Sequence, residues 1–231
     1  MRTISVIARK GGSGKSTIAL QIALAAHRRG WTSLVADADP QRSAGTALEA
    51  RSGAGPEVAL TSGSKLYQLQ WEAVRSGVQV MVIDTPAVVA EEIINAVVLA
   101  DICLLVVRPT FFDLAAAVQT LQIVRPLRRP VMALLNQAPV ARNGVEPAAV
   151  RKALQALGAM RMLVVPVIIR SRGIYQWASE RGLSVEETDD AAAAQEVGDL
   201  WSYLQRMALG PGGASHRPGD PGVRQTARVL G

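Results

Sequence analysis

The chain has 231 residues, of which 49% are hydrophobic and 19% are charged. This length and apolar content suit one domain with a well-buried core. No apolar run approaches the roughly 20 residues that cross a bilayer, and the N-terminus lacks the layout of a signal peptide. The single cysteine, Cys103, allows no disulfide within the chain and lies in an apolar run, which predicts a buried thiol in a reducing cytoplasm.

The formal net charge is +6, and arginine supplies most of the positive charge, since lysine occurs only at positions 10, 15, 65 and 152. Two interpretations remain open at this point. The charge either keeps an ordinary surface soluble or forms an electrostatic contact with nucleic acid or an anionic membrane. Aromatic residues make up only 4% of the chain, which argues against a protein that stacks single-stranded bases.

Continuously apolar, β-branched runs alternate with helix-like segments along the chain. The runs predict strands at 3–8, 33–40, 78–86, 100–109, 130–137 and 162–167. Apolar spacing predicts helices at 16–30, 64–76, 90–98, 112–125, 146–157, 172–182 and 190–208. This alternation indicates an α/β fold with a doubly wound, mostly parallel sheet and helices on both faces.

The composition changes at Gly210, where the segment 210–222 is dominated by glycine and proline. Such a segment cannot bury a core. We therefore expect one domain over 1–209 and a disordered tail over 210–231. The tail is either passive or a weak basic contact for nucleic acid or a partner.

A phosphate-binding loop is predicted between the first strand and the first helix. Residues 9–17 read RKGGSGKST, with glycine at 11, 12 and 14. Glycines let backbone N–H groups curl around phosphate oxygens, beside the positive end of the helix. We expect Gly11, Gly12, Ser13 and Gly14 to form the cradle. Lys15 would reach the terminal phosphates, the Ser16 hydroxyl would bind Mg²⁺, and Thr17 would hold the α-phosphate end.

Acidic residues end two of the predicted strands near this loop. Asp84 closes the run VMVID, and Asp37 and Asp39 lie in DADPQ. We expect Asp37 and Asp84 to organise the water shell of Mg²⁺ and Asp39 to orient the attacking water. Asp39 precedes Pro40, so a helix-capping role is the alternative for this residue.

Together, KGGSGKST with Lys10, DADPQ at 37–41 and VIDTP at 82–86 resemble the ParA/MinD family of deviant Walker A ATPases, in particular its ParA branch. The similarity runs over most of 1–208, including 108–117 and 165–185. It implies a fold of the P-loop NTPase type, with ATP and Mg²⁺ as ligands. It also implies a homodimer that encloses two ATP molecules, in which Lys10 crosses to the partner's nucleotide and acts in catalysis with Lys15 and Asp39.

The same resemblance implies non-specific binding of double-stranded DNA on the nucleoid and a ParB-like or other adaptor that stimulates hydrolysis. Arginine contacts to phosphates would provide affinity without base readout. The candidates for DNA contact are Arg142, Arg161, Arg170, Arg172, Arg181 and Arg206. Asn136 is the candidate for the adenine edge, with Pro166 and Val167 packing nearby.

Other branches of this family fit less well. The chain ends without the basic amphipathic helix of MinD, so we expect no membrane binding. One cysteine cannot hold the cluster of iron–sulfur relatives, and the chain resembles the short form without an N-terminal helix-turn-helix. The sequence thus predicts a cytoplasmic, nucleoid-associated ATPase that positions a plasmid, a chromosome region or a protein assembly such as a carboxysome. The alternatives are a metabolic ligase on the same fold, similar to dethiobiotin synthetase, and a scaffold whose hydrolysis is incidental.

Overall fold

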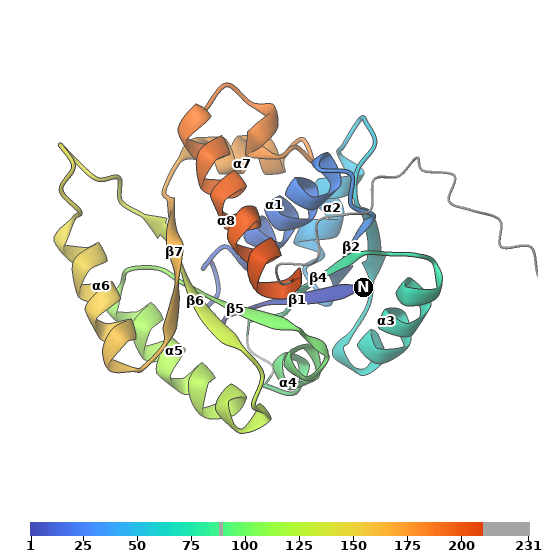
Figure 1. Cartoon of the computed structure of the whole chain (residues 1–231), viewed down its shortest axis with the longest axis horizontal. Helices are drawn as coiled ribbons and strands as arrows, with labels where there is room; N and C mark the ends of the chain where they lie inside the picture. The colour runs from blue at the N-terminus through green and yellow to red at the C-terminus, as the bar shows by residue number, and fades with distance from the viewer. Residues whose placement is uncertain (88–89, 210–231) are drawn as a thin grey trace, which may run out of the picture.

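The computed structural model describes residues 1–87 and 90–209, so the predicted tail over 210–231 lies outside the described residues. Seven parallel strands form one sheet in the order β3-β2-β4-β1-β5-β6-β7 (Figure 1). The predicted doubly wound α/β architecture is therefore confirmed, and within the described residues every strand pair is parallel.

The strands are β1 (Arg2–Ile7), β2 (Ser33–Asp37), β3 (Glu57–Leu60), β4 (Val80–Asp84), β5 (Ile102–Val107), β6 (Val131–Ala138) and β7 (Leu163–Arg170). All six predicted strands are present, with shorter ends at several. The prediction missed β3, because this edge strand has only four residues and is largely exposed. A short edge strand lacks the long apolar run that marks a buried one.

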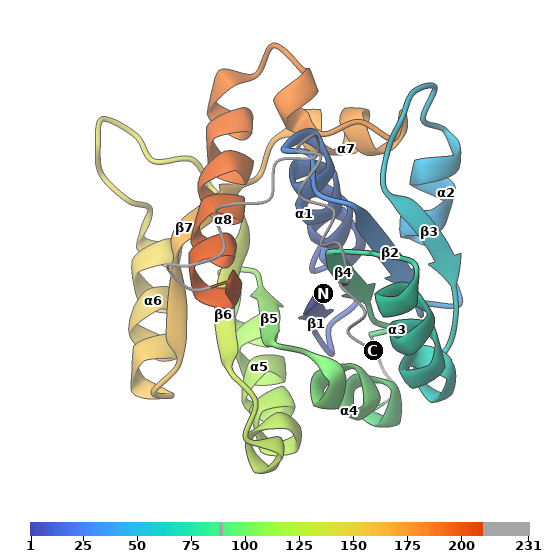
Figure 2. The ribbon, with the colours of Figure 1, turned by 45° about the vertical axis from the view of Figure 1, so that its right-hand side comes forward.

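Helices cover both faces of the sheet (Figures 1 and 2). One face carries α1 (Lys15–Arg28), α2 (Ser43–Glu49), α7 (Gly173–Ser179) and α8 (Ala191–Leu209). The other carries α3 (Leu66–Arg75), α4 (Ala90–Leu99), α5 (Phe111–Val124) and α6 (Ala148–Ala159). Three short 3-10 turns complete the described chain: η1 (Gly63–Lys65), η2 (Arg125–Leu127) and η3 (Val185–Glu187).

The core lies on both sides of the sheet. The largest apolar cluster joins α1 and α8 to the strands, and Trp201 of α8 is almost fully buried within it. Cys103 of β5 is fully buried in the cluster on the opposite face, as predicted, and burial raises the pKa of its thiol to about 12. No helix within 1–87 or 90–209 is long and apolar enough to cross a membrane.

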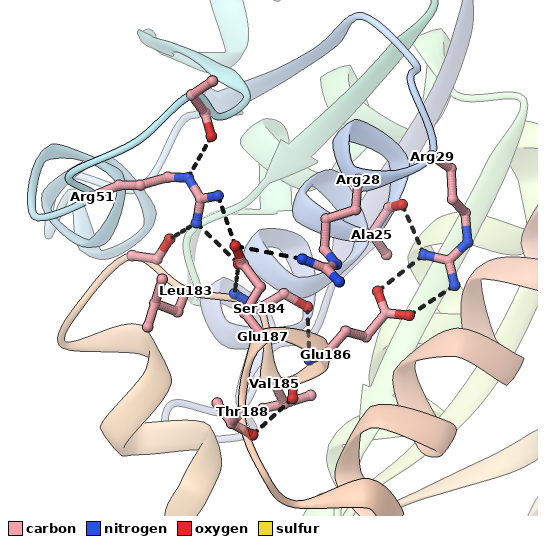
Figure 3. Close-up of polar contacts among 12 residues, drawn as sticks. Ala25, Arg28, Arg29, Arg51, Leu183, Ser184, Val185, Glu186, Glu187 and Thr188 are labelled. Atoms are coloured by element: carbon pink, nitrogen blue, oxygen red, sulfur yellow. Dashed lines mark hydrogen bonds and ion pairs between the residues drawn. The ribbon is translucent and has the colours of Figure 1, made fainter.

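A network of arginine and glutamate side chains fixes η3 to the ends of α1 and α2 (Figure 3). Arg51, just after α2, donates to both carboxylate oxygens of Glu187, at 2.9 and 3.0 Å. Arg29, just after α1, pairs in the same bidentate manner with Glu186. This bidentate geometry is the strongest that arginine and a carboxylate form. It fixes the end of α1 to η3 in the C-terminal part of the domain.

Candidate nucleotide site

The predicted phosphate loop lies between β1 and α1. Gly12 and Gly14 have φ angles of 72° and 91°, a region that residues with a Cβ rarely adopt. Two side chains at the end of β6 hold the loop from behind. Asn136 Nδ2 donates to the Ser13 carbonyl at 2.7 Å, and Gln137 Nε2 donates to the Gly12 carbonyl at 3.1 Å. The loop is therefore preformed, with its curve set by glycine and its position set by β6.

Lys15 begins α1 and is almost completely buried, with 6% of its surface exposed. Burial lowers the pKa of its ammonium group, while the charges of Asp84 and Asp39 act in the opposite direction. A cation that is only partly compensated in this way is well placed to receive a phosphate group. Ser16 and Thr17 follow it in the first turn of α1, and both are half-buried.

Asp37 and Asp84 are brought together by the sheet, because they are direct register partners at the ends of β2 and β4. Asp84 is fully buried, and neither of its carboxylate oxygens has a hydrogen-bond partner within the described chain. Burial raises its pKa to about 7, although the Ser16 side chain and Lys15 lower it. Buried polar atoms are normally paired, so these two oxygens indicate a site for a ligand.

Asp37 and Asp39 are oriented by backbone N–H groups. The Asp37 carboxylate accepts from the N–H groups of Asp39 and Gly45, at 3.1 and 2.9 Å. Burial nevertheless raises the pKa of Asp37. Asp39 accepts from the Gln41 N–H at 3.0 Å, a local turn that resembles the capping alternative. This turn engages one Asp39 oxygen and fixes the side chain at the rim of the site.

The acidic groups suit a hydrated magnesium ion better than an all-protein metal cage. Among residues 1–87 and 90–209, no three His, Cys, Asp or Glu side chains converge as a metal cluster. Mg²⁺ usually keeps several waters and binds one or two carboxylates together with phosphates. The unpaired Asp84 oxygens, with Asp37 beside them and Ser16 at the loop, fit that requirement.

Two cavities lie at this edge of the sheet. The first, of about 370 Å³, is lined by Gly14, Thr17 and Asn136 together with Arg170–Arg172 and Tyr175. The second, of about 460 Å³, lies over the acidic residues and is lined by Asp37, Asp39, Arg42, Lys65 and Glu92, among others. The first cavity borders the phosphate loop directly, through Gly14 and Thr17, whereas the second is bordered by the acidic residues that follow β2.

Pro166 does not reach the first cavity. β7 continues four residues beyond it, to Arg170, and Pro166 is an exposed residue in the middle of this edge strand. The residues that line the cavity are Arg170, Ser171 and Arg172 instead. The prediction of Pro166 placed the strand end too early, because the apolar run continues as far as Ile169.

Lys10 is exposed at the mouth of the loop. Its Nζ atom lies 5.6 Å from the ring centroid of Phe112, in the first turn of α5. Phe111 and Phe112 are themselves 78% and 69% exposed. The two lysines thus differ in position: Lys15 is buried at the start of α1, and Lys10 lies on the surface beside the loop.

The six arginines predicted to contact DNA do not share one surface. Arg170 and Arg172, beside the first cavity, pair with Glu146 and Glu196. Arg181 stacks on Trp177, at 4.2 Å from its ring centroid, and lies near Glu180. Arg142 is exposed in the loop before α6, Arg161 is at the opposite end of the sheet, and Arg206 is in the last turns of α8.

Sequence reasoning missed the support of the loop by Gln137 and by the loop after β5. Arg108 forms a bidentate pair with the nearly buried Asp113, whose carboxylate also accepts a hydrogen bond from the Thr110 hydroxyl. Its guanidinium approaches the position that a Cβ on Gly12 would take, at 3.7 Å. Arg108 and Gln137 lie at the ends of β5 and β6. Strand ends of one parallel sheet meet at one edge, so this position is the signal that could have identified both residues.

This fold, with a glycine loop on a buried lysine and two acids at neighbouring strand ends, defines a nucleotide-binding protein of the P-loop class. Residues 4–185 match the model of the CobQ/CobB/MinD/ParA nucleotide binding domain. The chain belongs to this family of ParA- and MinD-like ATPases.

Known relatives include proteins that position carboxysomes. The chain is 31% identical over 217 residues to the maintenance of carboxysome distribution protein A of Gloeobacter kilaueensis, covering 87% of this chain and 95% of that one. The corresponding protein of Halothiobacillus neapolitanus is 29% identical, with 86% and 94% covered.

Solved structures show the same fold at lower identity. Apo McdA of Cyanothece superposes with a TM-score of 0.74 at 17% identity, covering 88% of this chain and 99% of that one. MinD of Aquifex aeolicus gives 0.73 at 19% identity, covering 89% and 97%.

Proposed function

We propose that this chain is an ATPase that dimerises with ATP, binds double-stranded DNA without sequence preference and positions a cargo through partner-stimulated hydrolysis. The observation that carries the proposal is the pair of lysines. Lys15 is buried beside the unpaired carboxylate of Asp84, whereas Lys10 is exposed at the mouth of the same loop. Since the relatives are carboxysome distribution proteins, a protein assembly such as a carboxysome is the cargo we favour.

Each residue of the site has a role in this reaction. The N–H groups of residues 11–17 and the positive end of α1 bind the phosphates, and Lys15 neutralises the terminal ones. Asp39 orients the attacking water, because phosphoryl transfer depends mainly on positioning and charge stabilisation. Ser16, Asp37 and Asp84 would hold Mg²⁺, which would neutralise charge on the phosphates. The cavity between Asn136 and Arg170–Arg172 receives the base.

An exposed Lys10 explains why hydrolysis would depend on a dimer. A cation supplied by a second subunit stabilises the charge that develops in the transition state, as an arginine finger does. The site of one chain would then be complete only when a second copy docks against the carboxyl edge of the sheet. Binding and hydrolysis of ATP thereby shift the population between two states.

One experiment tests this cycle directly. Binding to double-stranded DNA is measured with ATP, with ADP and without nucleotide, at about 50 and about 200 mM salt. The molecular mass in solution is measured under the same conditions. We expect a dimer and salt-sensitive DNA binding with ATP alone. Binding that ignores the nucleotide would overturn the proposal, and positioning in cells that survives Asp39→Ala would show a scaffold instead of a cycling ATPase.

The cavity above Asp37 and Asp39 favours one alternative. Its volume of about 460 Å³ and its lining of both basic residues (Arg42, Lys65) and acidic residues (Asp37, Asp39, Glu92) leave room for a small polar substrate. A metabolic ligase would use that space. Stimulation of ATP hydrolysis by a small carboxylic acid, without DNA or a partner protein, would support this second function.

A further inference from the structure

Positive charge is concentrated in one part of this chain. Residues 114–179 contain a single acidic residue, Glu146, which pairs with Arg170. The same segment contains nine basic residues: Arg125, Arg128, Arg129, Arg142, Arg151, Lys152, Arg161, Arg170 and Arg172. The net charge of this segment, nine basic residues less one acidic residue, exceeds the net charge of +6 of the whole chain. The segment includes most of α5, α6 and strands β6 and β7.

Four of these arginines gather at the amino-terminal ends of β6 and β7. Arg125, Arg128 and Arg129 lie in or just after η2, and Arg161 lies between α6 and β7. The segments are adjacent, because Met132 pairs with Leu163 across the two strands and Arg125 donates to the Met160 carbonyl. Figure 2 shows α5 and α6 ending at this same end of the molecule. We call these four residues the basic corner.

The basic corner is not neutralised by the protein itself. All four side chains are exposed, and none forms an ion pair with an acidic residue in the described part of the chain. Asp101, which precedes β5 at the same edge of the sheet, pairs with Arg2 instead. Like charges at this density repel each other, so the corner is suited to an anionic partner.

Two of the arginines occupy backbone positions that favour glycine. Arg161 follows Met160, the C-cap of α6, with φ at 54°, and the N–H groups of Arg161 and Met162 donate to the Gly158 and Leu157 carbonyls. This is the Schellman motif, in which glycine is the usual residue. Arg128 ends η2 in the same left-handed region, with φ at 53°. The turns therefore do not require arginine at either position, and glycine could replace it without backbone strain.

The basic corner also lies away from the nucleotide. β6 has eight residues and spans about 25 Å, with Asn136 near its carboxyl end and the basic corner at its amino end. Arg170 and Arg172, by contrast, border the first cavity and are paired with glutamates. A polyanion on the basic corner would therefore leave the phosphate loop free.

We propose that the basic corner contacts the phosphate backbone of double-stranded DNA; this inference rests on the proposed function and locates its DNA surface. Residues 118–135 and 152–165 contain no aromatic side chain, so base stacking is not available there. Arginine on phosphate gives binding without sequence preference.

The test removes the two strained arginines together. Arg128→Gly/Arg161→Gly deletes two charges at positions where glycine suits the backbone, so we expect an unchanged or higher melting temperature. With ATP at about 100 mM salt, affinity for duplex DNA should fall at least ~tenfold, and the salt slope should decrease by about 2. The matched control is Arg28→Gln/Arg75→Gln, which changes the net charge equally on α1 and α3 and should bind like wild type. Because Arg28 also pairs with Glu187 at 3.5 Å, the melting temperature of the control is measured as well.

The outcomes separate this inference from the function on which it rests. If wild type fails to bind DNA with ATP, the proposed function is wrong. If wild type binds and the glycine variant matches the control, the basic corner is not the DNA surface. Vesicles containing phosphatidylserine provide the remaining arm. If wild type binds these vesicles but not DNA, and the glycine variant loses vesicle binding, the corner is a membrane contact and the inference is overturned.

Discussion

The ammonium group of Lys10 lies over the ring of Phe112, with Nζ 5.6 Å from the ring centroid. The contact joins the phosphate loop to the first turn of α5 and leaves both side chains exposed. Exposed cation–π contacts stabilise by only about 0.5–1 kcal/mol. Its own chain therefore holds Lys10 only weakly, as the proposed contact with a second subunit requires.

The first prediction concerns Lys10. Lys10→Ala should keep most nucleotide binding and lose stimulated hydrolysis at least ~tenfold, because it removes a cation that acts on the transition state. Lys15→Ala, the matched lysine in the cradle, should lose nucleotide binding itself. ATP turnover and nucleotide affinity distinguish the two.

A mixture of variants shows whether Lys10 acts across the dimer. Lys10→Ala and Asp39→Ala are each expected to be inactive alone. In a mixed dimer, the Lys10→Ala chain keeps its own Asp39 and receives Lys10 from its partner, so hydrolysis should return on mixing. If the mixture stays as inactive as the separate variants, Lys10 acts within its own chain.

The second prediction concerns the glycines of the loop. A Cβ on Gly14 would collide with the Asn136 side chain, and φ there is 91°. Gly14→Ala should weaken nucleotide binding at least ~tenfold, because both the backbone and the support from β6 must shift. Gly11→Ala is the control, since nothing lies within 4 Å of its Cβ position. Equal affinities for the two variants, measured by titration, would contradict the prediction.

The third prediction concerns Asp84 and pH. Its pKa is about 7 in the fold, above the ordinary value of 3.8, because burial disfavours the charged form. The ionised carboxylate therefore destabilises the nucleotide-free protein increasingly as pH rises from about 4 to about 7. Asp84→Asn should raise the melting temperature at about pH 8 more than at about pH 5, and should weaken binding of Mg²⁺ with nucleotide.

The control for Asp84 is Asp199→Asn, at an exposed position of α8. It should change the melting temperature little at either pH. If Asp84→Asn gives no greater gain at the higher pH than at the lower, burial does not raise the pKa of Asp84.

The fourth prediction concerns the network that joins α1, α2 and η3. Burial acts to raise the pKa of Glu187, but hydrogen bonds from Arg51 and the Ser184 N–H outweigh it, so the pKa lies below 4.5. Glu187→Gln should cost about 2 kcal/mol of unfolding free energy at neutral pH. Because the folded pKa is lowered, this loss should shrink as pH falls below about 4.5.

Denaturant unfolding at several pH values measures that loss. Glu180→Gln is the control, since Glu180 is 57% exposed and its contact with Arg181 is at 3.4 Å. Exposed pairs of this kind contribute little. A loss for Glu187→Gln that stays constant through the acid range would argue that packing, and not the charge, provides the stability.

Much of the fold follows from local sequence pattern. Continuous apolar runs predict the six strands with long apolar cores, since a strand buried on both faces needs an apolar residue at every position. The same runs miss β3 and α2, because Glu57–Leu60 and Ser43–Glu49 are short elements whose pairing depends on a neighbour far along the chain. Within the described residues their place is set by β2 and α1.

For the site, the sequence by itself determined where the phosphate loop and the acidic strand ends lie: Lys15 follows from a contiguous motif, and Asp37 and Asp84 follow from the ends of apolar runs. Only the tertiary structure decided how these groups are held. Strand register places Asp37 opposite Asp84, and the end of β6 places Asn136 against the Ser13 carbonyl of the loop. Because β7 extends four residues past Pro166, Arg170–Arg172 line the first cavity instead of Pro166. Ion pairing also depends on neighbours distant in sequence, so the structure alone separates the paired Arg170 and Arg172 from the exposed Arg161.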